Sequence, residues 1–171
     1  MEPVRIYDYL ALSRRRIFDW TRPLTPEQYT REHPIGLATL ARTLTHLYIS
    51  EWYYLERMQE RDVPAYDTWP IRDETPPPFA EIEAAWTEQA ARTRAALAEQ
   101  RDWTAPIQYR VTNDAGSVDL VTTTAADIAT QLALHEMHHR AQAMNMLRHL
   151  GVNAEDIDFN TLMYDRRPAP V

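Results

Sequence analysis

Residues 124–150 read TAADIATQLALHEMHHRAQAMNMLRHL, a stretch that contains four of the chain's six histidines and neither glycine nor proline. Thr124 followed by Asp127 has the form of a helix capping box, and Gly151 stands where a glycine commonly ends a helix. Together these signals predict one long helix over residues 124–150.

His135 and His139 lie on one face of this predicted helix, about 40° apart around its axis. Ile128, Leu132 and Met146 share the face, so we expect both imidazoles to point into an interior. Two histidines at positions i and i+4 can reach the same cation. The helix alone also allows the alternative of buried histidines that are satisfied by hydrogen bonds.

Glu136 directly follows His135 in the sequence, but it points roughly 100° away from it. A hydrolytic enzyme needs a general base beside its metal, and we do not assign that role to Glu136 for this reason. The pair Glu136 and His139 resembles the motif of di-iron bundles, which requires a second copy that this sequence lacks. A hydrolase is therefore the less favoured class of enzyme.

Three further helices are predicted from apolar residues that recur every three or four positions. They cover residues 3–20, 37–60 and 78–100. Residues 61–78 contain five prolines, which prevent a helix and predict a long connection that crosses over the end of the bundle. The aromatic side chains of this connection either cover the mouth of a pocket or pack against the bundle end.

Residues 107–111 and 117–121 alternate apolar and polar side chains around a turn-forming segment at 113–116, which predicts a small β-hairpin. The tail, residues 152–171, has little predicted regular structure. The expected fold is all-α: one domain over residues 1–171, a four-helix bundle with a long crossover connection between its second and third helices and a hairpin before its fourth.

Composition excludes several kinds of chemistry. The net charge of −7 argues against a nucleic-acid-binding surface, and the triplet Arg14-Arg15-Arg16 is interpreted as part of a solvated helix face. The chain has no cysteine and no lysine, so it offers no disulfide, no thiolate ligand and no Schiff-base lysine. Because no stretch reaches membrane-spanning length and no signal peptide is evident, we expect a cytoplasmic protein without membrane contact.

His46 is the only histidine in the helix predicted at 37–60, which makes it the natural third metal ligand. Three imidazoles with a fourth position left to water form an adaptable or catalytic site rather than a closed structural one. Glu51 points about 140° away from His46, into the apolar stripe of the same helix. There it needs an arginine or a hydroxyl donor as a structural partner.

The segments around these histidines resemble the DinB-like (DinB/YfiT) superfamily of small bacterial four-helix bundles. The matching sequences are LTHLYISEWYYLERM around His46, HEMHHRAQ from His135 and LRHLGV from Leu147. One departure is Ala141, where many relatives have glycine, a change that affects packing more than ligation. The resemblance implies that His46, His135 and His139 bind one divalent metal, which we expect to be Zn²⁺ or Ni²⁺.

The other histidines are given no ligand role. His138 and His149 are expected against a neighbouring helix or in solvent, and His33 is expected on the surface. Three more polar side chains serve either as pocket and supporting groups or simply in bundle packing: Ser50, Tyr53 and Gln142.

Several functions remain open at this level. A metal held by three histidines acts as a Lewis acid and lowers the pKa of a bound water or thiol. The resemblance implies a metal-dependent enzyme, in particular a thiol-dependent transferase that takes a low-molecular-weight thiol or another small molecule. The alternatives are a non-catalytic stress-response protein that binds a metal or ligand, and a structural dimer.

A second apolar strip on the helix at 124–150 faces away from the histidines and needs a partner to cover it. It consists of Leu134, Met137, Ala141 and Met144. We therefore expect a homodimer, which the resemblance also implies.

Overall fold

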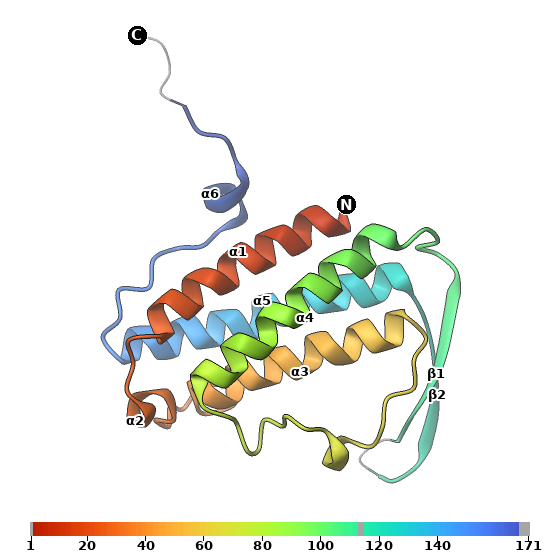
Figure 1. The fold of residues 1–171 in the computed structure, drawn as a ribbon, viewed down its shortest axis with the longest axis horizontal. Helices are drawn as coiled ribbons and strands as arrows, with labels where there is room; N and C mark the ends of the chain where they lie inside the picture. The colour runs from red at the N-terminus through yellow and green to blue at the C-terminus, as the bar shows by residue number, and fades with distance from the viewer. Residues whose placement is uncertain (1, 113–114, 168–171) are drawn as a thin grey trace.

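The computed structural model describes residues 2–112 and 115–167 (Figure 1). Four long helices form the body of the molecule, and they are α1 (Pro3–Thr21), α3 (Leu40–Met58), α4 (Phe79–Glu99) and α5 (Ala125–His149). Shorter elements lie between and after them, namely α2 (Pro26–Tyr29), η1 (Tyr66–Thr68), β1 (Pro106–Thr112), β2 (Val118–Thr124) and α6 (Phe159–Met163). The predicted helical bundle with an antiparallel hairpin before the last long helix is confirmed.

The helix α5 confirms the prediction made for residues 124–150. The Thr124 hydroxyl accepts a hydrogen bond from the amide of Asp127 at 3.1 Å and so caps the first turn. At the other end Gly151 has a φ of 84°, and its amide and the next one donate back to carbonyls of the last turn. The sequence itself therefore fixes where this helix begins and ends.

The four long helices form a square in which α1 and α3 each contact both α4 and α5. The helices α3 and α4 run in the same direction, so the connection at 59–78 returns along the length of the bundle (Figure 1). The predicted long crossover connection is confirmed, although it runs along the bundle rather than over its end. The connection therefore lies beside α3, where the rings of Trp52 and Trp69 are 4.9 Å apart.

Other boundaries differ by a few residues from the prediction. The helix α3 begins at Leu40, because Ala38 has a positive φ of 68° and Thr39 caps the first turn. The tail contains the short helix α6 where no regular structure was predicted. Residues 113–114 of the predicted turn and 168–171 of the tail lie outside the described residues. No helix among the described residues is long and apolar enough to cross a membrane.

A layer of buried polar side chains separates two apolar clusters of the core. Arg14 Nη2 donates to Glu51 Oε2 and to Glu136 Oε2, each at 2.5 Å. The hydroxyls of Tyr7 and Thr93 donate to Glu51 Oε1 at 2.6 and 2.7 Å, so all four long helices contribute. The partners expected for Glu51 are confirmed, whereas the interpretation of Arg14 as solvated is wrong, because Arg14 is only 5% exposed.

The electrostatics of this layer follow from burial and from the sharing of one guanidinium. Burial raises the pKa of Glu136, although the neighbouring Arg14 opposes that shift. Burial also disfavours the charge on Arg14, but Glu136 and Glu51 outweigh it and raise the pKa of Arg14. The guanidinium further lies 4.3 Å from the centre of the Trp86 ring, a favourable cation–π distance.

We expect Arg14→Met to lower the free energy of unfolding by about 3–5 kcal/mol, because two buried carboxylates lose their cation. Arg16→Met, on the exposed face of the same helix, is the matched control and should change it by less than about 0.5 kcal/mol. Urea unfolding at pH 7 measures both variants. Equal unfolding free energies for the two variants would contradict this description of the layer.

The deficit of Arg14→Met should depend on pH. A raised pKa of Glu136 means that the folded chain binds more protons than the unfolded chain, so stability falls as pH rises above about 4.3, the ordinary glutamate value. Without Arg14 the fall of stability with rising pH becomes larger, because Arg14 no longer opposes the raised pKa of Glu136. The deficit should therefore be largest at pH 7 and shrink toward pH 4.

Candidate metal centre

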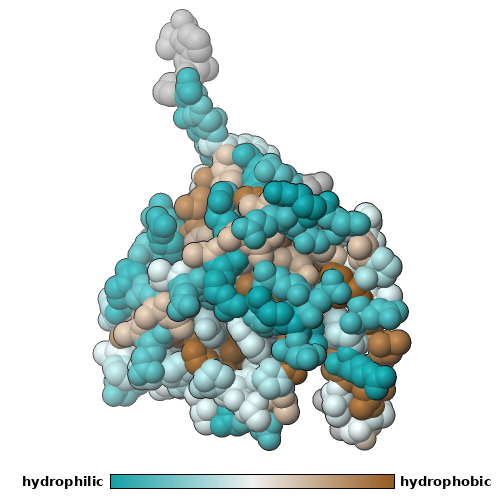
Figure 2. Space-filling view, turned by 45° about the vertical axis from the view of Figure 1, so that its right-hand side comes forward, coloured by the Kyte–Doolittle hydropathy of each residue, from teal (hydrophilic) through white to brown (hydrophobic). Residues whose placement is uncertain are grey.

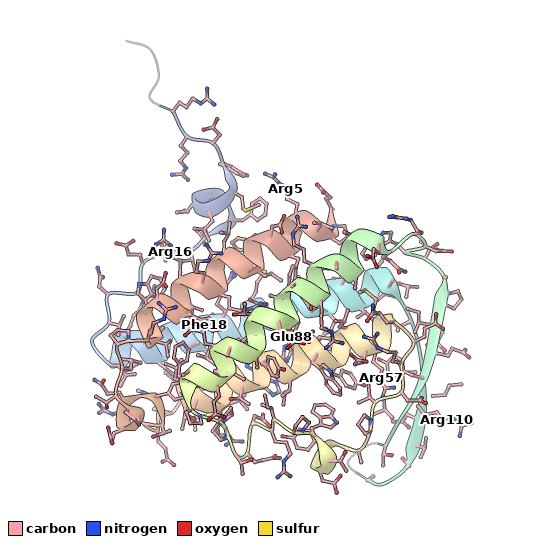
Figure 3. The ribbon with its side chains drawn as sticks, in the orientation of Figure 1. Arg5, Arg16, Phe18, Arg57, Glu88 and Arg110 are labelled. Carbon is pink, nitrogen blue, oxygen red and sulfur yellow. The ribbon has the colours of Figure 1, made fainter. Side chains whose placement is uncertain are left out.

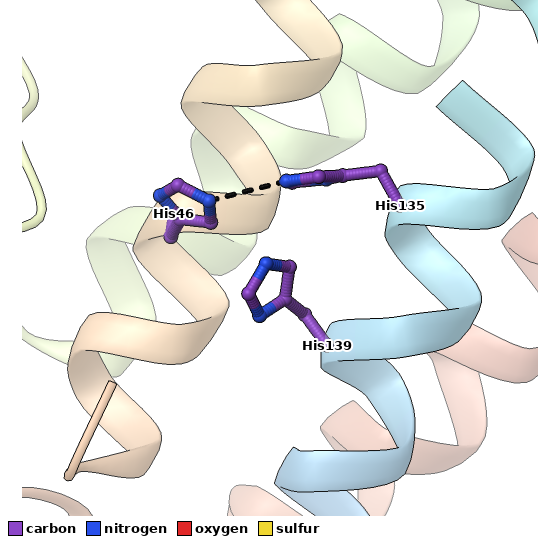
Figure 4. Close-up of side chains that lie close together, drawn as sticks. All are labelled: His46, His135 and His139. Carbon is purple, nitrogen blue, oxygen red and sulfur yellow. Dashed lines mark hydrogen bonds between the residues drawn. The ribbon is translucent and has the colours of Figure 1, made fainter. Parts of the chain in front are cut away.

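Three histidines from two helices converge on one point (Figure 4). His46 comes from α3, and His135 and His139 come from successive turns of α5. One nitrogen from each imidazole can be chosen so that all three lie within 4.8 Å of one another. The three histidines singled out in the sequence therefore form one cluster that could hold a metal ion.

One nitrogen–nitrogen separation in the cluster matches the spacing of ligands on a tetrahedral metal. Zn–N bonds of about 2.0–2.1 Å at tetrahedral angles place two nitrogen ligands about 3.3 Å apart. The Nε2 atoms of His46 and His135 are separated by 3.2 Å. The ring of His139 closes the group, with its centre 4.6 Å from that of His135 and 4.7 Å from that of His46.

Hydrogen bonds on the far side of two imidazoles leave their Nε2 atoms available. His46 Nδ1 lies 2.9 Å from Asp73 Oδ2, and because a carboxylate only accepts, the proton belongs on Nδ1. His139 Nδ1 lies 2.8 Å from Gln142 Oε1, which requires the same tautomer. Such outer partners orient metal-binding histidines and raise their basicity. Gln142 thus takes one of the two places predicted for it, that of a supporting group.

Asp73 is the residue of this centre that sequence analysis missed. It lies in the proline-rich connection, where no periodicity places it near a helix. Its carboxylate accepts a hydrogen bond from the Tyr66 hydroxyl, and Arg42 Nε donates to its backbone carbonyl at 3.2 Å. Only the path of the connection along α3 brings Asp73 to His46, so no local pattern in the sequence could have identified it.

The backbone at Gly36 lies close against the side chain of Gln142. Gly36 has a φ of 48°, and a Cβ atom built on it would collide with the side-chain amide of Gln142. A residue other than glycine would therefore be strained here and would displace the group that orients His139. The loop before α3 is in this way part of the metal centre.

The imidazoles on α5 are held in their neutral form. Burial, together with smaller effects of the neighbouring His139 and His46, lowers the pKa of His135 to about 4. Burial also lowers the pKa of His139, against the opposing effect of its hydrogen bond to Gln142. Both are therefore neutral at pH 7, which is the form that binds a metal.

Residues 135–139 read HEMHH and so contain the letters of the HExxH motif of zinc proteases. In those proteases the glutamate is the general base beside the metal. Here Glu136 is 5% exposed and accepts from Arg14 at 2.5 Å in the polar layer of the core. Its side chain is committed to that layer, which agrees with the prediction that it is not a general base.

The remaining histidines lie outside the cluster. His138 is exposed, and its Nε2 accepts a hydrogen bond from Gln142 Nε2 at 3.0 Å. The prediction that His33 lies on the surface is wrong, because it is only 8% exposed and its ring lies 6.0 Å from that of His149.

A cleft of about 950 Å³ lies beside the cluster, with His46 and Asp73 in its wall. It is formed by α3, the connection and β1, and Figure 2 shows the hollow between the end of the hairpin and the body of the molecule. Ser50 and Tyr53 line it, as one of the two alternatives predicted. The aromatic residues Tyr66 and Trp69 line it too, so the connection covers a pocket rather than the bundle end.

Comparison with known proteins agrees with this architecture. The model of the DinB family matches residues 1–168. The chain therefore belongs to the DinB family, in agreement with the resemblance seen in its histidine-containing segments. None of the curated proteins matches the chain.

Asp73→Asn should weaken metal binding by about 10- to 100-fold, because the neutral amide orients and polarises His46 less well than the carboxylate does. Asp67→Asn is the matched control, an exposed residue of the same connection. Competition with a chromogenic chelator gives both affinities. Identical metal affinities for the two variants would show that Asp73 does not contribute to metal binding.

Proposed function

We propose that this protein binds one divalent metal, Zn²⁺ or Ni²⁺, through His46, His135 and His139 and works as a metal-dependent enzyme. The observation that carries the proposal is a cluster of three imidazoles beside a cleft large enough for a small substrate. A metal bound by three histidines acts as a Lewis acid and lowers the pKa of a water or thiol that joins it.

The chain's own residues favour a thiol over water as the second reactant. Hydrolysis requires a general base near the metal. The carboxylate of Glu136 is hydrogen-bonded to Arg14, and that of Asp73 is hydrogen-bonded to His46 and Tyr66, so neither serves as that base. A thiol that ionises on binding needs no such base. Because the chain has no cysteine, the thiol would come from a low-molecular-weight co-substrate. We therefore favour a thiol-dependent transferase over a hydrolase.

The alternative is a stress-response protein that binds a metal or ligand without turnover. The polar outer contacts of His46 and His139 would serve a binding site as well as a catalytic one. The cleft argues against a protein that only stores a cation, because such a site needs no room for an organic molecule.

We also propose a homodimer, formed through α1 and the outer face of α5. Leu134 and Met137 on α5 are 58% and 44% exposed. They border an apolar hollow of about 530 Å³ that α1 also lines. The prediction that Met144 belongs to this strip is wrong, because Met144 is buried in the protein's own core. Exposed apolar surface of this kind is commonly covered by another subunit.

Metal analysis of histidine variants tests the proposed ligands. His135→Ala and His139→Ala should each abolish stoichiometric metal, because two remaining ligands make a poor site. His46→Ala should do the same, and it is the most informative change, since only tertiary structure brings His46 to α5. His138→Ala is the matched control and should keep its metal. Metal content should also fall on acidification, because protons compete for the imidazoles.

Full metal content in His46→Ala together with loss in His138→Ala would show that the site is local to α5. The same variants, assayed for conjugation of a thiol to an electrophile, separate the enzyme from the binding protein. An enzyme loses conjugation with its metal. A metal-loaded protein that conjugates none of a broad panel of thiols and electrophiles supports the non-catalytic alternative.

Sedimentation analysis at micromolar concentration tests the dimer. We expect twice the 20.0 kDa mass of one chain, and Met137→Arg should shift the protein to monomer because the charge would be buried in the interface. Arg16→Met, a change on α1 outside the residues that line this hollow, should leave the dimer intact. A wild-type protein that sediments as a monomer would contradict the proposal.

A further inference from the structure

One face of α3 forms a continuous wall of the cleft. His46, Ser50, Tyr53 and Arg57 all line it. Residues at i, i+4, i+7 and i+11 return to nearly the same face of a helix, and the first and last are about 16 Å apart along its axis. The cleft therefore has the metal centre at one end and Arg57 at the other.

Arg57 is an unusual residue in this wall. It is 8% exposed, and its guanidinium lies 5.0 Å from the ring centre of Tyr53 and 4.5 Å from that of Tyr109. Its Nη2 donates to the backbone carbonyl of Arg110 at 3.4 Å, and its buried Nε has no hydrogen-bond partner in the described part of the chain. Among the described residues, no carboxylate forms an ion pair with it.

A buried cation without an anion is unfavourable, and two aromatic rings offset only part of its cost. Arg110 lines this part of the cleft as well, and Figure 3 shows Arg57 near the hairpin end of α3 and Arg110 on the hairpin. Two acidic residues of the cleft wall, Asp73 and Glu74, share the single hydroxyl proton of Tyr66 near the histidine cluster. Asp67, the other acidic residue among the described residues of the cleft wall, is exposed and forms no ion pair with Arg57.

We propose that the cleft binds an elongated anionic ligand that lies along α3. One end carries the atom that reaches the metal, and the other carries a carboxylate or phosphate that pairs with Arg57, roughly 10–16 Å away. The aromatic side chains of Tyr53, Tyr66 and Trp69 contact its middle. This inference rests on the proposed metal-binding function and adds the ligand's charge and length.

The test uses synthetic thiol peptides as probes. A tetrapeptide with an N-terminal cysteine spans about 13–14 Å when extended, whereas a dipeptide spans about 7 Å. The tetrapeptide is made with a free carboxylate, with a C-terminal amide, and with a phosphoethanolamine end, so that the anion is varied and little else changes. A version with serine in place of cysteine removes the thiol. Binding is followed by tryptophan fluorescence, since Trp69 lines the cleft.

We expect the metal-loaded protein to bind the carboxylate or the phosphate tetrapeptide at least tenfold more tightly than the amide, and the tighter one identifies the anion. The dipeptide acid should show no such advantage over its amide, because it is too short. Arg57→Met should make all tetrapeptides equal, and Arg57→Lys should restore part of the preference. Arg16→Met should leave it unchanged. Equal binding of the three tetrapeptides by the wild-type protein overturns the proposal.

The metal-free protein separates this inference from the proposed function. It should bind the tetrapeptides more weakly but still prefer the anionic ends, because Arg57 does not depend on the metal. If the serine probe binds the metal-loaded protein as tightly as the cysteine probe, thiol binding at the metal fails while the anion site stands. If the thiol matters but the anion does not, the inference fails while the metal site stands.

Discussion

Arg14 sits between Glu51 of α3 and Glu136 of α5, and the rest of the structure depends on this buried contact. Removal of all three charges from water is tolerable only if both carboxylates reach the one guanidinium, which allows a single alignment of the two helices. His46 lies five positions before Glu51, and His135 immediately precedes Glu136. The alignment that satisfies the charges is therefore also the one that brings the imidazoles together.

Much of this protein could be predicted from its sequence, because most of the signals are local. The long helices follow from apolar periodicity and from caps such as Thr124 and Gly151, and the histidine pair follows from its spacing. The predictions that failed concerned contacts made only in the tertiary structure. Arg14 belongs to an arginine triplet that looks solvated, and Asp73 lies in a loop, so only the folded chain shows the contacts they make. The path of the connection along α3 likewise emerges only when the helices pack.

The elements added to the bundle determine what lies beside the histidine cluster. The connection at 59–78 supplies Asp73 to His46 and lays Tyr66 and Trp69 along α3, while β1 closes the opposite side. A bare bundle would hold the histidines but no cleft. The same connection that orients one ligand thus forms the wall against which a substrate would lie, and the proposed chemistry and the proposed ligand depend on one segment.

The central claim is that the contact of Arg14 with both carboxylates sets the register of α3 and α5 and so assembles the three histidines. The most direct measurement is the metal affinity of Arg14→Met, determined by chelator competition under conditions where circular dichroism shows that the variant is folded. We predict an affinity at least about tenfold weaker than that of the wild-type protein, as for a residue that positions metal ligands indirectly. An unchanged affinity in the folded variant would contradict the claim.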